Sequence, residues 1–88
     1  MMETKIGHIT HYYSRISVAV LFLTDKLELG DTIHVLGHTT DFIQKISSME
    51  IEHKKVFSVS PGDDEVAIKV IEPVRRGDAI YKIIDESE

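Results

Sequence analysis

The sequence predicts an all-β fold, a small closed antiparallel β-barrel of six to eight strands. Three observations support this prediction. Apolar residues recur with the two-residue period of strands and not with the 3.6-residue period of helices. Strand-like segments follow one another about every 8–12 residues, separated by turns rich in Gly, Pro and Asp. A chain of 88 residues has room for one small core, and closure of the sheet would remove exposed strand edges.

The first predicted strands cover residues 5–13 and 15–23. The first segment is rich in Ile, Thr and Tyr, which favour extended backbone. The second contains an uninterrupted apolar run, Val18–Leu23, so we expect it to be buried on both faces or to bend from one face to the other. A loop over residues 24–31 follows and ends in a Gly-Asp turn.

The pattern of residues in the middle of the chain predicts two more strand segments. Residues 32–36 alternate, with Ile33 and Val35 expected inward, and a polar turn covers residues 37–41. Residues 42–49 then place Phe42, Gln44, Ile46 and Ser48 on one face, and a strand-like segment continues through Ile51 and Val56.

The last third of the chain contains two further strands. The turn Pro61–Asp64 precedes a cleanly alternating segment over residues 65–71. The Arg76-Gly77-Asp78 turn opens the final strand over residues 79–84, and residues 85–88 form an acidic tail expected to fray. The same Gly-Asp-x-Ile phrase begins the strand at Thr32. The expected inward residues are Ile9, Val18, Val20, Phe22, Leu29, Ile33, Val35, Ile46, Met49, Ile51, Val66, Ile68, Val70 and Ile80.

Composition predicts one domain over residues 1–88, with a core over about 6–84. Ten Lys and Arg against fifteen Asp and Glu give a net charge of −5, and the chain contains no cysteine. The longest apolar run is six residues, too short to cross a membrane, and the N-terminus lacks a signal-peptide layout. We therefore expect a cytoplasmic protein without membrane association.

No residue pattern predicts catalysis, a cofactor or a metal. His34 and His38 are four apart, but Gly37 and the strand pattern argue against the helix that would align them as zinc ligands. His8 and His11 are expected on opposite faces of a strand, because an odd offset changes the face. The carboxylates of Asp63, Asp64 and Glu65 lie in a Pro-Gly turn, where such groups are usually solvated. No phosphate-binding Gly-Lys pair is present.

A small contact surface for single-stranded RNA or for a protein partner is a further candidate. Aromatic faces can stack on exposed bases while flanking cations hold phosphates, although the net charge of −5 argues against a long nucleic-acid footprint and against DNA binding. The alternative is that one tyrosine packs inward and the basic pairs are solvated. The candidate residues are Tyr12, Tyr13, Arg15, Lys54, Lys55, Arg75 and Arg76.

An ordered set of short motifs resembles a known module. The motifs are Gly7-His8-Ile9, Leu27–Val35, Ser48–Ile51, Pro61-Gly62-Asp63, Val66-Ala67-Ile68 and Arg76-Gly77-Asp78. In this order they resemble the β-barrel second domain of translational GTPases such as elongation factor Tu, over about residues 6–84. A related barrel also looks to be appended to some collagenase-like peptidases. The chain is most similar to free-standing translation elongation factor-like proteins.

The resemblance implies a role in protein biosynthesis without GTPase activity. A P-loop is absent, and a chain without Asn cannot contain the guanine signature. The turn over residues 61–65 looks one residue longer than its counterpart near the aminoacyl-end pocket, so that pocket is not transferred. We expect a non-catalytic module that binds tRNA, ribosomal RNA or a ribonucleoprotein surface. The alternative is a protein-interaction subunit that docks on a separately encoded enzyme, such as a collagenase-like peptidase or a GTPase.

Overall fold

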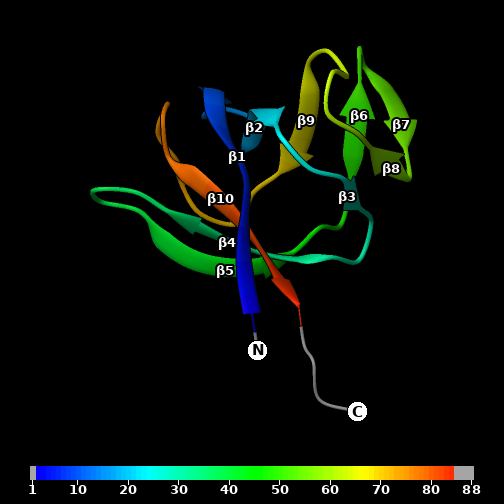
Figure 1. Ribbon diagram of the computed structural model, residues 1–88. Helices are drawn as coiled ribbons and strands as arrows, with labels where there is room; N and C mark the ends of the chain where they lie inside the picture. The colour runs from blue at the N-terminus through cyan, green and yellow to red at the C-terminus, as the bar shows by residue number, and fades with distance from the viewer. Residues whose placement is uncertain (1, 85–88) are drawn as a thin grey trace.

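The computed structural model describes residues 2–84, which form ten β-strands and contain no helix (Figure 1). Residues 85–88, the predicted acidic tail, lie outside the described part of the chain. In chain order the strands are β1 (Met2–Tyr13), β2 (Val18–Leu23), β3 (Leu27–Glu28), β4 (Thr32–Leu36), β5 (Asp41–Lys45), β6 (Met49–Ile51), β7 (Lys54–Val56), β8 (Ser58–Val59), β9 (Val66–Lys69) and β10 (Ala79–Ile84).

Eight of these strands form one antiparallel sheet in the order β5-β4-β10-β1-β2-β9-β6-β7, while β3 and β8 form a separate two-stranded ribbon. The long strand β1 lies near the middle and pairs with β10 on one side and with β2 on the other. Met2 is opposite Ile84, so the first and last described residues lie side by side (Figure 1). The all-β antiparallel prediction is confirmed.

The sheet is curled around one hydrophobic cluster. Strand β1 contains two bulges, one between Lys5 and Gly7 and the other between Ile9 and His11. A bulge inserts an extra residue and increases the local bend and twist of the strand. The hydrogen-bonded strand order nevertheless has two ends, β5 and β7, so the expected closure into a barrel is not confirmed.

Gln44 connects parts of the sheet that are not neighbours. Its side chain extends from β5, where it is 6% exposed. The side-chain amide donates to the carbonyl of Lys69 in β9 at 2.9 Å, and the side-chain carbonyl accepts from the N–H of Ile71 at 2.9 Å. Ile46, just beyond β5, makes two backbone hydrogen bonds with the loop after β3. Its carbonyl accepts from the N–H of Gly30, and its N–H donates to the carbonyl of Asp31.

Three Gly-Asp turns share one hydrogen-bond pattern. In each, the Asp N–H donates to the carbonyl three residues earlier, at 3.0–3.1 Å, and the Asp carboxylate accepts from the N–H of that same residue, at 2.8 Å. The glycine before the Asp has a φ of 89–95°, which favours a residue without Cβ. The prediction that the Gly30-Asp31 and Gly77-Asp78 turns launch strands with an inward Ile is confirmed, since Ile33 and Ile80 are fully buried. The turns cover residues 28–31, 60–63 and 75–78.

The predicted inward residues are mostly confirmed, but those of β2 are wrong. The buried side chains of β2 are Ala19, Leu21 and Leu23, whereas the expected Val18, Val20 and Phe22 lie on the outer face. The uninterrupted apolar run carries no alternation, so the sequence could not determine which face is inside. The prediction that Leu29 points inward is also wrong. Leu29 is 36% exposed in its turn, while Leu27, two residues earlier, is fully buried.

Several element boundaries also differ from expectation. The segment 42–49 divides, because β5 ends at Lys45 and β6 begins at Met49. The continuation through residues 51–56 is a hairpin, in which β6 pairs with β7 around a two-residue turn. The predicted loop over residues 24–31 contains the short strand β3. These short segments acquire strand geometry from their partners and carry no periodic pattern of their own.

Candidate functional site

The structure separates the seven candidate contact residues. Tyr12 packs against the core, and Tyr13, the next residue, is 49% exposed on the outer face. Lys54 and Lys55 are exposed in β7, at one end of the sheet. The remaining candidates, Arg15, Arg75 and Arg76, are exposed in loops.

The two basic pairs come from opposite sides of β1 in the strand order. Lys54 and Lys55 lie in β7, which is separated from β1 in the sheet by β2, β9 and β6. Arg75 and Arg76 lie just before β10, which is the neighbour of β1 on its other side. Gly77, next to this second pair, is held by a hydrogen bond from its N–H to the carbonyl of Ile9. The Arg76-Gly77-Asp78 tripeptide is part of this turn, and Asp78 is only 6% exposed.

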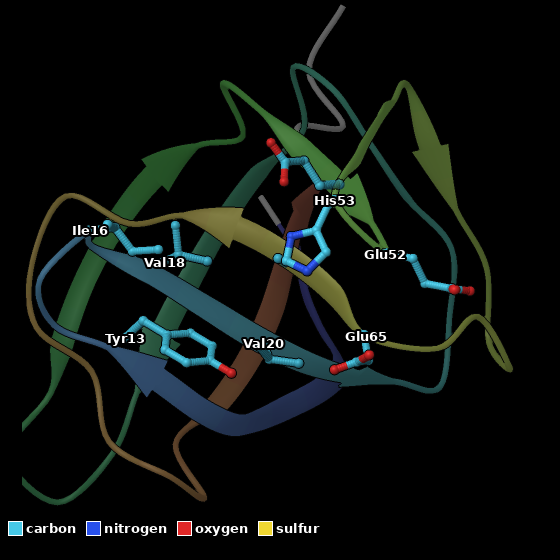
Figure 2. A pocket seen from close by; sticks show the side chains of 9 residues that line it. Tyr13, Ile16, Val18, Val20, Glu52, His53 and Glu65 are labelled. Carbon is cyan, nitrogen blue, oxygen red and sulfur yellow. The ribbon is translucent and has the colours of Figure 1, made fainter.

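One candidate residue lies in a hollow on the outer face of the sheet, which we call the Tyr13 hollow. Figure 2 shows the ring of Tyr13 along the floor, and the imidazole of His53 extending toward the floor from the opposite rim. The carboxylate of Glu65 faces Val20, while the side chain of Glu52 points away. The hollow has a volume of about 280 Å³ and is lined by Tyr13, Ile16, Val18, Val20, Glu50, Glu52, His53, Glu65 and Ala67.

The floor of the hollow follows from the register of three strands. Val20 in β2 is opposite Ala67 in β9, which is in turn opposite Glu50 in β6. Directly paired residues point to the same face of an antiparallel sheet. Ala67 is the smallest of the three, so the outer face is lowest at β9 and rises toward Val20 and Glu50.

The rim contains an unusual concentration of left-handed backbone. Within residues 2–84, four residues other than glycine have a positive φ: Ser17, Glu52, His53 and Glu65, at 49–69°. Three of them line the hollow, and the fourth lies between Ile16 and Val18, which also line it. A residue with a Cβ is disfavoured in this conformation, and such residues concentrate at functional sites.

The hollow is acidic as well as apolar. Its lining contains three glutamates and one histidine, but no lysine or arginine. Among the described residues, none of these three glutamates is in an ion pair or accepts a side-chain hydrogen bond. A second hollow of about 370 Å³ adjoins it and shares Val18, Glu50 and Ala67.

Aromatic and imidazole rings continue the outer face along β1. His8 stacks at 5.3 Å on Phe22, and His11 meets Tyr13 edge-on at 4.3 Å between ring centroids. The prediction that His8 and His11 face opposite sides is wrong. The bulge between Ile9 and His11 inserts Thr10, which returns His11 to the outer face.

A second titratable cluster lies away from the hollow. His34 donates or accepts at both ring nitrogens, with Nδ1 2.8 Å from Glu3 Oε1 and Nε2 2.6 Å from Asp41 Oδ1. These contacts raise the pKa of His34 above 6.5, the Glu3 hydrogen bond first and the Asp41 hydrogen bond second. Within residues 2–84, no group of three His, Cys, Asp or Glu side chains is placed to hold a metal ion. The same residues include no helix capable of crossing a membrane.

Two curated proteins are similar to the chain. It is 37% identical over 80 residues to an uncharacterized protease of Methanocaldococcus jannaschii. This alignment covers 90% of the chain and 19% of the relative. It is 32% identical over 88 residues to a collagenase of Porphyromonas gingivalis. This alignment covers 98% of the chain and 24% of the relative. The chain thus spans about a fifth to a quarter of the length of these relatives. No protein-family model matches the sequence.

Solved structures show the same fold. The C-terminal domain of a Geobacillus thermoleovorans protein described as a U32 peptidase superposes with a TM-score of 0.82, over 90% of this chain and 91% of that one. The selenomethionine variant of that domain gives a TM-score of 0.80. The sequence identity is 18% in both cases, so this likeness concerns the fold.

These similarities contradict the resemblance to the second domain of translational GTPases. The relatives are named as proteolytic enzymes, and the matching fold is the C-terminal domain of a peptidase. The expected translation elongation factor-like role is therefore wrong, and the similarities give no support to the expected binding of tRNA or ribosomal RNA. The Gly-Asp turns that carried much of it share one hydrogen-bond pattern, so they reflect turn geometry and do not distinguish families.

Sequence reasoning missed most of the hollow. Val18 and Val20 were assigned to the core, and Glu65 to a solvated acidic turn. The uninterrupted apolar run of β2 was the one sequence feature that indicated such a surface. A strand with apolar residues on both faces can turn only one face to the core, so its other face is an apolar surface that is either exposed or covered by another part of the protein. Nothing local indicated that Glu50 and His53, far along the chain, would border the same surface.

Proposed function

We propose that residues 6–84 form an accessory domain of a U32-type peptidase, which docks on the rest of that peptidase and contributes binding to it, not catalysis. The observation that carries the proposal is the alignment: nearly the whole chain corresponds to about a fifth of a protease. The likeness to a crystallised C-terminal domain supports a fold that forms independently. The rest of the peptidase could belong to the same chain or to another one.

The outer face of β2 supports a docking role. Phe22 is 54% exposed there, and Ile16 is 56% exposed in the preceding turn. Ile16 lines the hollow together with Val18, Val20 and Tyr13, and Phe22 extends this apolar face along β2. Clustered exposed apolar residues mark interaction surfaces more often than isolated ones do.

Docking can be tested with the M. jannaschii relative. Its remaining four fifths, without the segment that aligns to this chain, would be produced separately and titrated with the 88-residue chain by calorimetry. We expect a 1:1 complex with a Kd on the order of micromolar, as for transient domain interfaces. The Phe22→Asp variant should weaken it at least tenfold, whereas Ile43→Asp, which alters an equally exposed residue on β5, should not. Absence of binding at about 100 μM would contradict the proposal.

A further inference from the structure

The Tyr13 hollow combines two kinds of surface. Its floor is apolar, with Val18, Val20 and Ala67, and Tyr13 adds an aromatic ring. Carboxylates border it: that of Glu65 faces Val20 (Figure 2), and Glu50, in β6, also lines the hollow. A complementary occupant must be apolar where it meets the floor and positively charged where it meets the rim.

The volume of about 280 Å³ suits one side chain better than a drug-sized ligand, which needs about 300–1,000 Å³. A leucine side chain would match the floor, but it would take carboxylates out of water without giving them a partner. An acidic side chain would be repelled by the glutamates. Lysine and arginine satisfy both requirements, because each carries a charged head on an apolar stem.

Tyr13 distinguishes between these two cations. The guanidinium of arginine is planar, stacks on aromatic rings and donates several hydrogen bonds in a fixed geometry, whereas an ammonium is compact and strongly hydrated. Carboxylates and an aromatic ring at the same hollow therefore favour arginine. The chain supplies no such group to the lining, which contains neither arginine nor lysine.

We propose that the Tyr13 hollow is a binding site for one arginine side chain, presented by the part of the peptidase on which the chain docks. The identity of the partner rests on the proposed function. The preference for arginine rests on the floor, the ring of Tyr13 and the carboxylates of Glu50 and Glu65. The left-handed backbone at Glu65 places its carboxylate at the rim, at a conformational cost that binding would offset.

Nuclear magnetic resonance titration of the 88-residue chain can test the preference without the partner. The probes are three capped tripeptides, acetyl-Gly-X-Gly-amide, in which X is arginine, lysine or citrulline. We expect saturable shifts of the Val18, Val20 and Ala67 signals, with a Kd for arginine on the order of millimolar. Lysine should bind more weakly, and citrulline, which has the same shape without the charge, at least tenfold more weakly. Equal binding of arginine and citrulline, or of arginine and lysine, would overturn the assignment.

Variants locate the site. Glu65→Gln and Glu50→Gln should each weaken arginine binding about threefold, as expected for partly exposed charge pairs. Glu72→Gln, which removes an exposed carboxylate from the loop before β10, is the matched control and should have no effect. Equal effects of all three variants would indicate attraction by net charge alone and would contradict a defined site.

The double variant Glu50→Gln/Glu65→Gln connects the hollow to docking. In the calorimetric assay with the M. jannaschii relative, it should weaken docking by a factor similar to its effect on the arginine peptide. Unchanged docking, together with lost peptide binding, would overturn the assignment of the arginine to the peptidase. Peptide binding without any docking would instead contradict the proposed function while leaving the arginine preference intact.

Discussion

Gln44 and Ile71 are 27 residues apart, yet the side-chain carbonyl of Gln44 accepts a hydrogen bond from the backbone N–H of Ile71 at 2.9 Å. The amide of the same side chain donates to the carbonyl of Lys69. Gln44 thus takes the place of a strand partner for the end of β9, although β5 and β9 are not neighbours in the sheet. One buried side chain therefore ties an edge of the curled sheet to a strand across the core.

Replacing Gln44 with Met should be strongly destabilising. Methionine has a similar length but leaves the Lys69 carbonyl and the Ile71 N–H without their partner. Both hydrogen bonds are partly buried. A fully buried unpaired group costs about 1–3 kcal/mol, so we expect the free energy of unfolding to fall by about 1–3 kcal/mol in urea denaturation. Ile43→Met, at the exposed neighbouring position, should change it by less than about 0.5 kcal/mol. Similar stabilities for the two variants would show that the hydrogen bonds of Gln44 contribute little.

The Gly-Asp turns should differ in stability according to burial. Asp78 and Asp63 accept the same hydrogen bond at 2.8 Å, from Arg75 N–H and Ser60 N–H, but only the first bond is partly buried. Asp78→Ala should therefore cost about 1–3 kcal/mol, and Asp63→Ala less than about 1 kcal/mol, because water replaces the exposed acceptor. Thermal unfolding of both variants would measure the difference, and equal losses would be inconsistent with this explanation.

Gly7 should tolerate no side chain. A methyl group at this position would overlap the backbone carbonyl oxygen of Phe22 in the paired strand β2, and backbone atoms cannot move aside as a flexible side chain can. We expect Gly7→Ala to lower the free energy of unfolding by more than about 2 kcal/mol. Gly62→Ala is the control. A methyl there meets nothing within 4 Å, so only the left-handed backbone, with φ at 95°, contributes a cost of about 1 kcal/mol. A larger loss for Gly62→Ala would contradict this order.

His34 should make stability depend on pH. Because folding raises its pKa above 6.5, the protonated ring stabilises the fold fully below the unfolded pKa, about 6.5, and this stabilisation is lost as the pH rises through the folded pKa. The free energy of unfolding should thus fall as the pH rises from about 6.5 through the folded pKa of His34. His34→Gln should remove that dependence. Titration of the ring proton by nuclear magnetic resonance gives the pKa directly, and a value at or below 6.5 would refute the prediction.

The parts of the fold that the sequence predicted are those with a local cause. Alternation over residues 32–36 correctly placed Ile33 and Val35 inside, because the side-chain period of a strand is set by its own backbone. The Gly-Asp turns were recognisable because Gly30 and Gly77 supply the positive φ that each turn requires. The resemblance built on these turns was misleading for the same reason, since any antiparallel fold can use them.

The sequence by itself therefore determined the all-β class, the turns and most of the core. Only the tertiary structure decided which face of β2 is outside, how the bulge between Ile9 and His11 in β1 brings His8 and His11 to one side, and that Gln44 spans the core. The Tyr13 hollow also exists only in the tertiary structure, because its floor and rim come from strands that pair with one another across the sheet. The physical reason is that alternation and turn geometry are properties of a few adjacent residues. Strand phase, bulges and hollows depend on which distant strands become partners.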